Sequence, residues 1–263
     1  MLPVDDLGEP VPLPGPPHRV VSLVPSLTEA VLTDVAEPST LVGATDYCTH
    51  PPDLDVTRVG GSKYPDVDRV LALRPDLVLA NSEENRPEDV MRLRADGIPV
   101  WVTAAPATVP AALGSLRRLL GTAWDAEPPW LVEAEHLWRE VTPPRARAVV
   151  PVWRKPWVVL GRDTFAGDVL RRLGVVNAFA THPDRYPRPP LADLQHADLV
   201  ILPDEPYPFT PTDGPEHFPT LRPVHVSGRH LTWYGPSLVP ARPALEAALN
   251  AELNDAERST QPP

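Results

Sequence analysis

Tyrosine and tryptophan side chains are concentrated in the loops that the sequence predicts, rather than in its predicted strands and helices. All five tyrosines fall in such loops, together with three of the seven tryptophans. They are Tyr47, Tyr64, Tyr186, Tyr207, Tyr234, Trp153, Trp157 and Trp233. An aromatic ring with a polar tip suits an amphipathic binding surface, whereas a ring that only packs is expected on a strand or helix. The pattern favours binding of a flat or apolar ligand; the alternative is that proline-rich loops need aromatic rings simply to pack.

Carboxylates follow two apolar segments of the chain, where they could act as general acids and bases. Glu83 follows residues 76–80 and Glu205 follows residues 198–202, each with a second carboxylate next to it. A pair of carboxylates that face a cleft could transfer protons. Acidic loops more often bind polar ligands or face water, so an enzyme that uses these carboxylates or Tyr47 is kept as an alternative.

No catalytic or nucleotide-binding motif accompanies these residues. The chain lacks Gly-x-Ser-x-Gly, a Walker loop and Gly-x-Gly-x-x-Gly, and Gly60-Gly61 is a turn signal. The sequence Cys48-Thr49-His50 does not have the spacing of a four-ligand zinc site. Cys48 is the only cysteine, so the chain forms no internal disulfide. We therefore predict neither catalytic nor metal-ligating residues.

Composition and charge narrow the class of protein. The 263 residues, 42% of them hydrophobic, suffice for one large domain or two lobes of about 100–130 residues. The 38 prolines predict short elements joined by stiff loops. The net charge of −11 argues against a nucleic-acid-binding protein, which usually has a basic surface. No apolar run is long enough to insert into a membrane. Residues 1–18 lack the pattern of a signal peptide, which predicts a cytoplasmic location.

Apolar runs alternate with helical segments along the chain, as in parallel βαβ units. We expect strands at 19–24, 40–44, 76–80, 98–102, 147–152, 158–160 and 198–202, and helices at 26–31, 66–73, 87–95, 109–120, 127–141, 163–173 and 236–253. Ser26 and Glu29 have the spacing of a capping box at the first helix. Residues 76–83 and 198–205 are similar to one another, which favours two α/β lobes on either side of the helix at 127–141. In such sheets ligands bind beyond the carboxyl ends of the strands, where the aromatic loops are.

Several segments of the chain resemble a known family. They are Arg19–Glu29, Val42–Cys48, Arg58–Gly61, Val70–Leu79 and Gly97–Val100. They are similar to the cobalamin- and siderophore-binding components of bacterial ABC importers, the helical-backbone or class III substrate-binding proteins. The resemblance is strongest over residues 19–121 and continues in register to about residue 250. It implies an α/β fold of two lobes with parallel sheets, joined by a single long linker helix.

These considerations together predict five segments. They are a proline-rich arm at 1–18, an N-terminal α/β lobe at 19–121, a linker-helix region at 122–143, a C-terminal α/β lobe at 144–254 and a frayed tail at 255–263.

The resemblance further implies a non-catalytic receptor that holds a metal chelate between its lobes. The chelate would be a corrinoid, a haem or a ferric siderophore, bound as ligand, with no cofactor required. Carried over by position, the first lobe would contribute Tyr47, Lys63, Tyr64, Asn81 and Glu83, and the second Trp153, Arg154, Trp157, Tyr186, Glu205, Tyr207 and Trp233. The rings would sandwich a flat macrocycle, while Lys63, Arg154 and Glu205 would contact its polar groups.

The resemblance also implies an ABC permease as partner, which members of the family contact through one glutamate on each lobe. The nearest residues in this chain are Glu88 and Asp193. The sequence given shows no leader or lipobox, so we expect a cytoplasmic relative that carries a chelate or uses the fold for another small molecule. A sensor or protein-interaction module is the remaining alternative.

Overall fold

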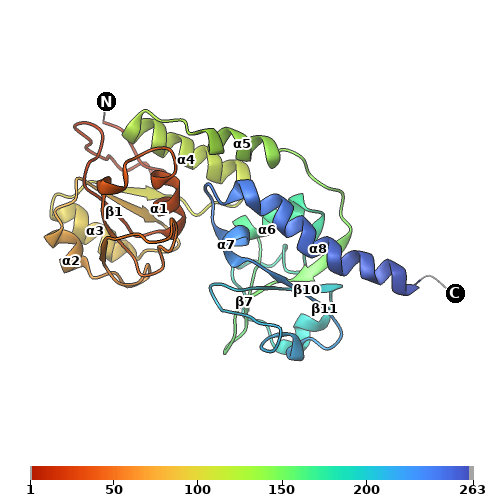
Figure 1. The fold of residues 1–263 in the computed structure, drawn as a ribbon. Helices are drawn as coiled ribbons and strands as arrows, with labels where there is room; N and C mark the ends of the chain where they lie inside the picture. The colour runs from red at the N-terminus through yellow and green to blue at the C-terminus, as the bar shows by residue number, and fades with distance from the viewer. Residues whose placement is uncertain (1, 261–263) are drawn as a thin grey trace. The chain divides into compact units, whose positions relative to one another are not determined.

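The structure is a computed structural model that describes the backbone of residues 2–260 and the side chains of residues 2–253. It divides into two compact units (Figure 1). The first contains residues up to Ala105 together with 112–133 and 234–236, and the second contains 106–111, 134–233 and the chain from Ser237 onward. Each unit has its own parallel sheet and its own core.

A five-stranded parallel sheet forms the centre of the first unit, in the order β3-β2-β1-β4-β5. Its strands are β1 (Val20–Ser22), β2 (Leu41–Ala44), β3 (Thr57–Arg58), β4 (Leu77–Asn81) and β5 (Val100–Thr103), and the elements between them are α1 (Pro25–Leu32), η1 (Pro38–Thr40), α2 (Val67–Ala72) and α3 (Pro87–Ala95). Every residue of β1, β4 and β5 is buried. Strands buried on both faces are characteristic of a parallel sheet with helices on either side.

The second unit has a four-stranded parallel sheet in the order β11-β10-β6-β9. Its strands are β6 (Ala146–Val149), β9 (Val175–Asn177), β10 (Leu199–Pro203) and β11 (Arg222–Val226), and the helical elements are α6 (Phe165–Arg172), η2 (Leu191–Gln195), η3 (Pro215–His217), α7 (Gly228–Thr232) and α8 (Leu238–Thr260). A short antiparallel pair, β7 (Pro151–Trp153) and β8 (Val158–Val159), extends beyond β6.

The two sheets share one strand order. The first contains β2-β1-β4-β5 and the second β9-β6-β10-β11, so that β4 and β10 each pair with the first strand of their unit. The similar segments 76–83 and 198–205 cover these two strands. The predicted fold of two α/β lobes with parallel sheets is therefore confirmed.

Two helices lie where the chain passes between the units, and the sequence predicts both, at 109–120 and 127–141, although it assigns only the second to the linker. These are α4 (Val109–Trp124) and α5 (Pro129–Leu137). The chain breaks between them because Asp125 has a positive φ of 52° and Pro128 and Pro129 follow. α4 is the longer of the two helices. The boundary between the units falls within each of them, so both helices contribute residues to both units.

Three expectations about helix ends are wrong. α1 begins at Pro25 after Val24, without a side-chain cap, because a proline already fits the first helical position. Thr164, not Asp163, precedes α6, since the φ of Asp163 is 52°. The predicted frayed tail is helical through Thr260, and its last three residues lie outside the described part of the chain.

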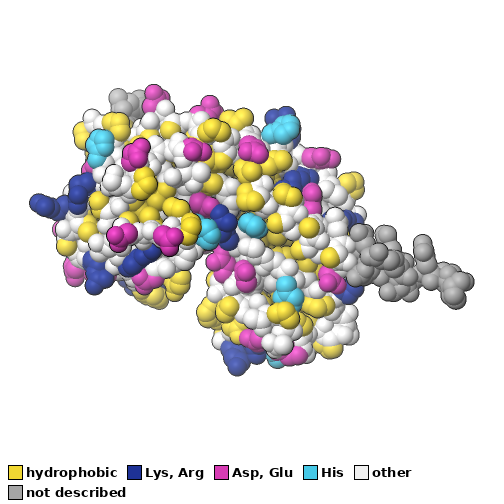
Figure 2. All heavy atoms as spheres, in the orientation of Figure 1, with side chains coloured by type: hydrophobic (Ala, Val, Ile, Leu, Met, Phe, Trp, Pro, Cys, Tyr) yellow, Lys and Arg dark blue, Asp and Glu magenta, His cyan; other side chains and the backbone are white. Residues whose placement is uncertain are grey.

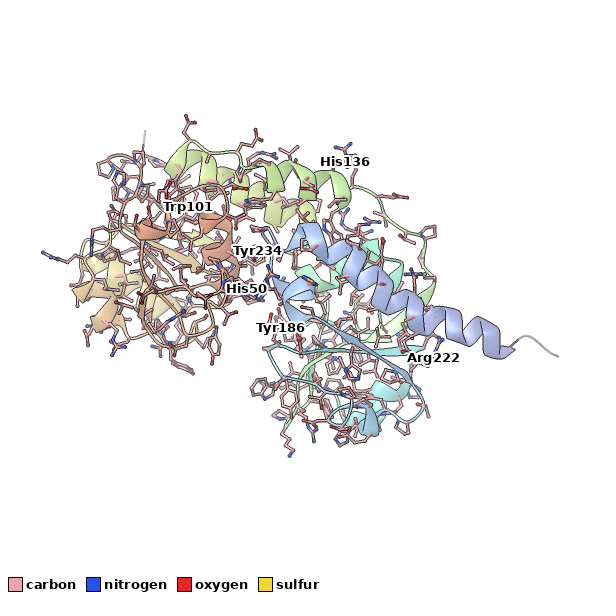
Figure 3. The ribbon with its side chains drawn as sticks, viewed as in Figure 1. His50, Trp101, His136, Tyr186, Arg222 and Tyr234 are labelled. Atoms are coloured by element: carbon pink, nitrogen blue, oxygen red, sulfur yellow. The ribbon has the colours of Figure 1, made fainter. Side chains whose placement is uncertain are left out.

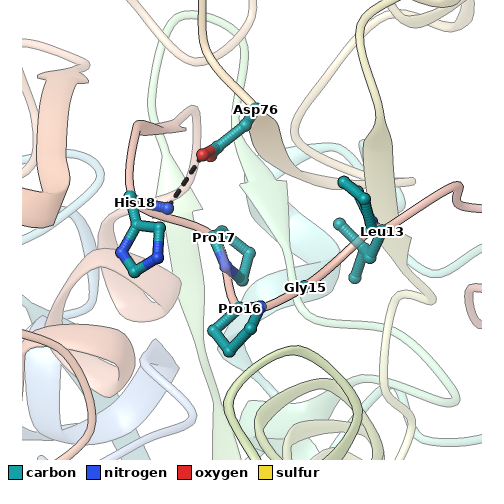
Figure 4. Close-up of a pocket in the computed structure, with 7 residues that line it drawn as sticks. Leu13, Gly15, Pro16, Pro17, His18 and Asp76 are labelled. Atoms are coloured by element: carbon teal, nitrogen blue, oxygen red, sulfur yellow. Dashed lines mark hydrogen bonds between the residues drawn. The ribbon is translucent and has the colours of Figure 1, made fainter.

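The proline-rich arm is anchored to the first unit by two carboxylates, the buried Asp5 and the partly exposed Asp76. Asp5 accepts backbone N–H groups of Leu7 and Glu9 at 2.9 Å, and its other oxygen is 2.6 Å from the Arg94 guanidinium. At the end of the arm, Asp76 accepts the backbone N–H groups of His18 and Arg19 (Figure 4). A cavity of about 310 Å³ lies between the arm and Asp76, at the amino end of β4.

The surface carries charges of both signs. On the face that Figure 2 shows, acidic and basic side chains are interspersed among apolar ones without forming one basic patch. In the described part of the chain, no helix combines the length and apolar character that crossing a membrane requires.

Replacing Asp5 by alanine is expected to destabilise the first unit by about 3 kcal/mol, because it leaves the Arg94 guanidinium without its buried partner. Urea denaturation measures the change. The matched control is Glu9→Ala, an exposed carboxylate on the same arm, for which the expected change is within about 0.5 kcal/mol. Equal stability of the two variants would contradict an anchoring role of Asp5.

Candidate functional site

Most of the predicted site residues follow the carboxyl ends of strands in the two parallel sheets. In the first unit they come at the ends of β2, β3 and β4. In the second unit Tyr186 follows β9, and Glu205 and Tyr207 follow β10. The other residues of the second unit lie elsewhere: Trp153 ends the antiparallel strand β7, Arg154 and Trp157 lie between β7 and β8, and Trp233 follows α7. Parallel strands place their carboxyl ends at one edge of a sheet. The residues therefore form two groups, one in each unit.

Four of these residues are the exposed aromatic side chains of the described part of the chain. The exposed fractions are 64% for Tyr47, 70% for Tyr64, 46% for Trp153 and 39% for Tyr186. The remaining tyrosines, tryptophans and phenylalanines are buried or partly buried. Each unit carries two of these rings, and large rings left in solvent indicate surfaces that can contact a flat apolar ligand.

In the first unit, the loops after β2 and β3 carry Tyr47 and Tyr64. Tyr47 lies beside Gly61, because a Cβ atom on that glycine would be 3.4 Å from the tyrosine ring. The guanidinium of Arg86 lies over the ring of Tyr64 at 4.8 Å, within the range of a cation–π contact. Lys63 donates its Nζ to the backbone carbonyl of Glu83 at 3.4 Å. The two predicted polar residues thus join two loops of the same unit.

Asn81 has a structural role in this unit. Its Nδ2 donates to the Thr103 hydroxyl at 3.0 Å and to the Tyr234 hydroxyl at 2.8 Å, and its Oδ1 accepts the backbone N–H of Glu83 at 2.8 Å. The side chain is buried. Because its donors and acceptor are already paired, Asn81 orients the loop after β4, and no part of its amide is left to bind a ligand.

Tyr234 is a buried residue that sequence reasoning placed in a loop but did not include in the site (Figure 3). It belongs to the three-residue segment 234–236 that packs in the first unit, far in sequence from the rest of that unit. Burial and the nearby charge of Glu84 raise the pKa of its hydroxyl strongly. Tyr234 is therefore neutral near pH 7 and unsuited to act as a base.

In the second unit, Trp153 and Tyr207 form the outer part of an aromatic cluster. Their ring centroids are 5.7 Å apart in an edge-to-face arrangement. Behind them, Trp157 stacks parallel to Phe209 at 6.2 Å and meets Phe218 edge-on at 5.3 Å. Trp157 therefore supports the cluster from the core, while Trp153 remains half-exposed. Tyr186 lies in the separate loop after β9 (Figure 3).

Arg154 is held inside this cluster. Its guanidinium forms ion pairs with Asp213 and, at 3.6 Å, with Glu216. It also lies 5.8 Å from the centroid of the Trp157 ring and 5.9 Å from that of Tyr207. The arginine charge is thus balanced within the unit, and its main effect is to position the two rings.

Glu205 and Trp233 form a pair at the ends of β10 and α7. The Trp233 indole donates to the Glu205 carboxylate, yet Oε1 of the carboxylate is shielded from solvent and has no hydrogen-bond partner. Burial raises the pKa of the Glu205 carboxyl, and the neighbouring Asp204 adds to the effect, while Trp233 and Arg229 act against it. Trp233 itself is buried, so its contribution to a binding surface is indirect.

The Cys48 thiol and the Asp168 carboxylate both have structural roles. Burial raises the pKa of the Cys48 thiol, whose Sγ lies 3.1 Å from the hydroxyls of Thr28 and Thr45, so the thiol is not a nucleophile. Asp168 borders a cavity of about 220 Å³ in the second unit and accepts from the Val109 backbone N–H and Arg172. It joins the beginning of α4 to α6.

Comparison with known proteins gives one family and a set of relatives. A family model described as periplasmic binding protein matches residues 20–199. The vitamin B12-binding protein of Vibrio cholerae serotype O1 is 25% identical over 185 residues, which is 66% of each chain. The match thus spans about two thirds of that relative's length.

Solved structures agree in fold. The periplasmic vitamin B12 binding protein of Vibrio cholerae is 18% identical and superposes with a TM-score of 0.73, covering 93% of this chain and 100% of the other. A periplasmic heme binding protein from Pseudomonas aeruginosa is 24% identical, with a TM-score of 0.72 over 90% of this chain and 93% of the other.

Replacing Glu205 by glutamine is expected to stabilise the protein at pH 7 and to have little effect at pH 4. In the unfolded chain the pKa of the Glu205 carboxyl is near 4.5, and burial in the folded chain raises it. The folded chain therefore holds the proton of this carboxyl more tightly than the unfolded chain does. That stabilisation is complete below the unfolded pKa and is lost as the pH rises through the folded pKa. Glutamine cannot ionise and avoids the loss.

Urea denaturation at the two pH values measures the difference between the variant and the original chain. Glu140→Gln, an exposed carboxylate of the same unit, is the control and should show the same small change at both. A Glu205→Gln variant that is less stable than the original chain at pH 7 would rule out this account of the carboxylate.

Proposed function

Because the chain belongs to the periplasmic binding protein family, with the class III fold, we propose that it binds a flat metal chelate without catalysing a reaction on it, and that the chelate is a corrinoid. The family supports a binding protein, and the named relative binds vitamin B12. The same fold occurs in a heme-binding protein, which makes haem the first competitor.

The exposure of Tyr47, Tyr64, Trp153 and Tyr186 is the observation that carries this proposal. Leaving four large rings in water forgoes the burial that would otherwise stabilise the fold. Tyr47, Tyr64 and Tyr186 follow the carboxyl ends of β2, β3 and β9, where open α/β sheets bind ligands. Each ring offers a face and an edge of apolar surface, which suits a macrocycle better than a small polar solute.

The polar groups beside these rings are mainly used inside the protein. Arg154 is paired with two carboxylates, and Asn81 is fully hydrogen-bonded. The binding energy is therefore expected to come chiefly from contact with the rings, and little from ion pairs. We further propose that the partner of the loaded protein is an ABC permease, with exposed Glu88 and Asp193 as the docking carboxylates.

The proposal is tested by absorption spectroscopy of the purified chain titrated with cyanocobalamin, haemin and a ferric catecholate siderophore. We expect saturable binding of cyanocobalamin with a Kd in the micromolar range or below, about −8 kcal/mol or stronger. Native mass spectrometry of freshly purified protein should show one chelate bound per chain. No binding of any of the three would refute the proposed function.

Replacing Trp153 by alanine is expected to weaken chelate binding by about 1–3 kcal/mol, because it removes an exposed ring and its edge-to-face contact with Tyr207. Isothermal titration calorimetry with cyanocobalamin measures the loss. Met91→Ala truncates another exposed apolar side chain, on α3 and away from the strand ends, and should leave the affinity unchanged. If both variants bind as the original chain does, Trp153 is not part of the site.

A further inference from the structure

Glu205 occupies a position that the backbone holds closely. The Gly228 backbone N–H donates to the neighbouring Asp204 carboxylate at 2.6 Å. A Cβ atom on Gly228 would lie only 2.6 Å from the carbonyl oxygen of Glu205 and 2.7 Å from its nitrogen. The loop after β10 and the beginning of α7 are therefore in direct contact here, which fixes the backbone of Glu205.

The Glu205 carboxylate is incompletely paired. Trp233 donates to it, but Oε1 is shielded from water and has no hydrogen-bond partner. A buried acceptor without a donor is unfavourable for folding, and such groups in native proteins call for an explanation in function. The raised pKa of the carboxyl agrees with that cost. The residue is nevertheless partly exposed, so its side chain reaches the surface of the unit.

Arg229 is the cation whose charge acts on the Glu205 carboxyl, and its guanidinium lies 5.7 Å from the centroid of the Trp233 ring, yet Oε1 of Glu205 has no hydrogen-bond partner. The other cations of the neighbouring loops are also not bonded to this oxygen. The charge of Arg154 is balanced by Asp213 and Glu216. Lys155 is exposed, so solvent and salt screen its charge. The loop that begins with Asp204 and Glu205 thus carries a carboxylate two residues before Tyr207, whose ring contacts that of Trp153.

We propose that Glu205 is a specificity-determining residue that accepts a hydrogen bond from an uncharged amide on the rim of the chelate and disfavours a chelate whose rim carries carboxylates. The inference rests on the proposed function, because it concerns the same site. It assigns this chain a preference for amide-bearing macrocycles, such as corrinoids, over carboxylate-bearing ones, such as haem.

The preference follows from charge and hydrogen-bond direction. An amide N–H that meets a carboxylate forms a charge-assisted hydrogen bond, which is stronger than a neutral one. A carboxylate on the ligand would place a second negative charge beside Glu205 in a site of low dielectric constant. It could be accommodated only with an extra proton, so its binding is weaker.

Two corrinoids that differ only in their rim separate this effect from stacking on the rings. Dicyanocobinamide carries amides around the corrin, whereas dicyanocobyrinic acid carries carboxylates around the same ring. We expect the original chain to bind the amide form about tenfold or more tightly than the acid form. Glu205→Gln should reduce that ratio about tenfold, because glutamine is neutral and can also donate to a carboxylate. The matched control, Glu140→Gln, should keep the original ratio.

The outcomes distinguish this inference from the function on which it rests. If the original chain binds both forms equally, or if Glu205→Gln keeps the preference, the inference is wrong while chelate binding stands. Binding of haemin with no binding of dicyanocobinamide would also overturn it and leave a chelate receptor. Absence of binding to every probe would refute both. Circular dichroism checks that the variants fold. If Glu205→Gln does not fold, the ratio of the original chain's affinities for dicyanocobinamide and dicyanocobyrinic acid tests the inference by itself.

Discussion

Parallel pairing of a fully buried strand is the constraint on which each unit depends. β4 and β10 are buried along their whole length, and each pairs with the first strand of its unit. A parallel ladder of this kind must be covered on both faces, so helices return the chain between strands. The return connections also bring every strand to the same edge with its carboxyl end. The loops that follow the strands of one sheet are therefore neighbours by topology, with the loop of Glu83 among those of the first unit and the loop of Glu205 among those of the second.

In each unit, the polar groups near the strand ends divide into those that hold the loops in place and those that remain available to a ligand. Asn81 and Arg154 make several contacts within their own units and keep adjacent segments in position. The exposed rings and the carboxylate of Glu205 are not used in this way. A binding surface needs this division, because loops without internal hydrogen bonds would have to be ordered by the ligand at a cost in affinity.

The two units repeat one topology but differ in how their loops are closed. In the first unit, the buried amide of Asn81 organises the loop after β4 and bonds to Tyr234, 153 residues away. In the equivalent loop of the second unit, Pro203 replaces the asparagine and the indole of Trp233 contacts Glu205 instead. The first unit thus buries its polar connection completely, whereas the second leaves one carboxylate oxygen unpaired.

The sequence by itself determined the strand–helix alternation, the repeat of 76–83 and 198–205, and α3 at residues 87–95, because apolar runs, proline and glycine act locally. It missed β11, whose Pro223 and two basic or titratable side chains suit the edge of a sheet and not its centre. It placed Trp233 and Trp153 alike, yet one is buried and the other half-exposed. Exposure and pairing depend on neighbours far along the chain, which only the tertiary structure brings together.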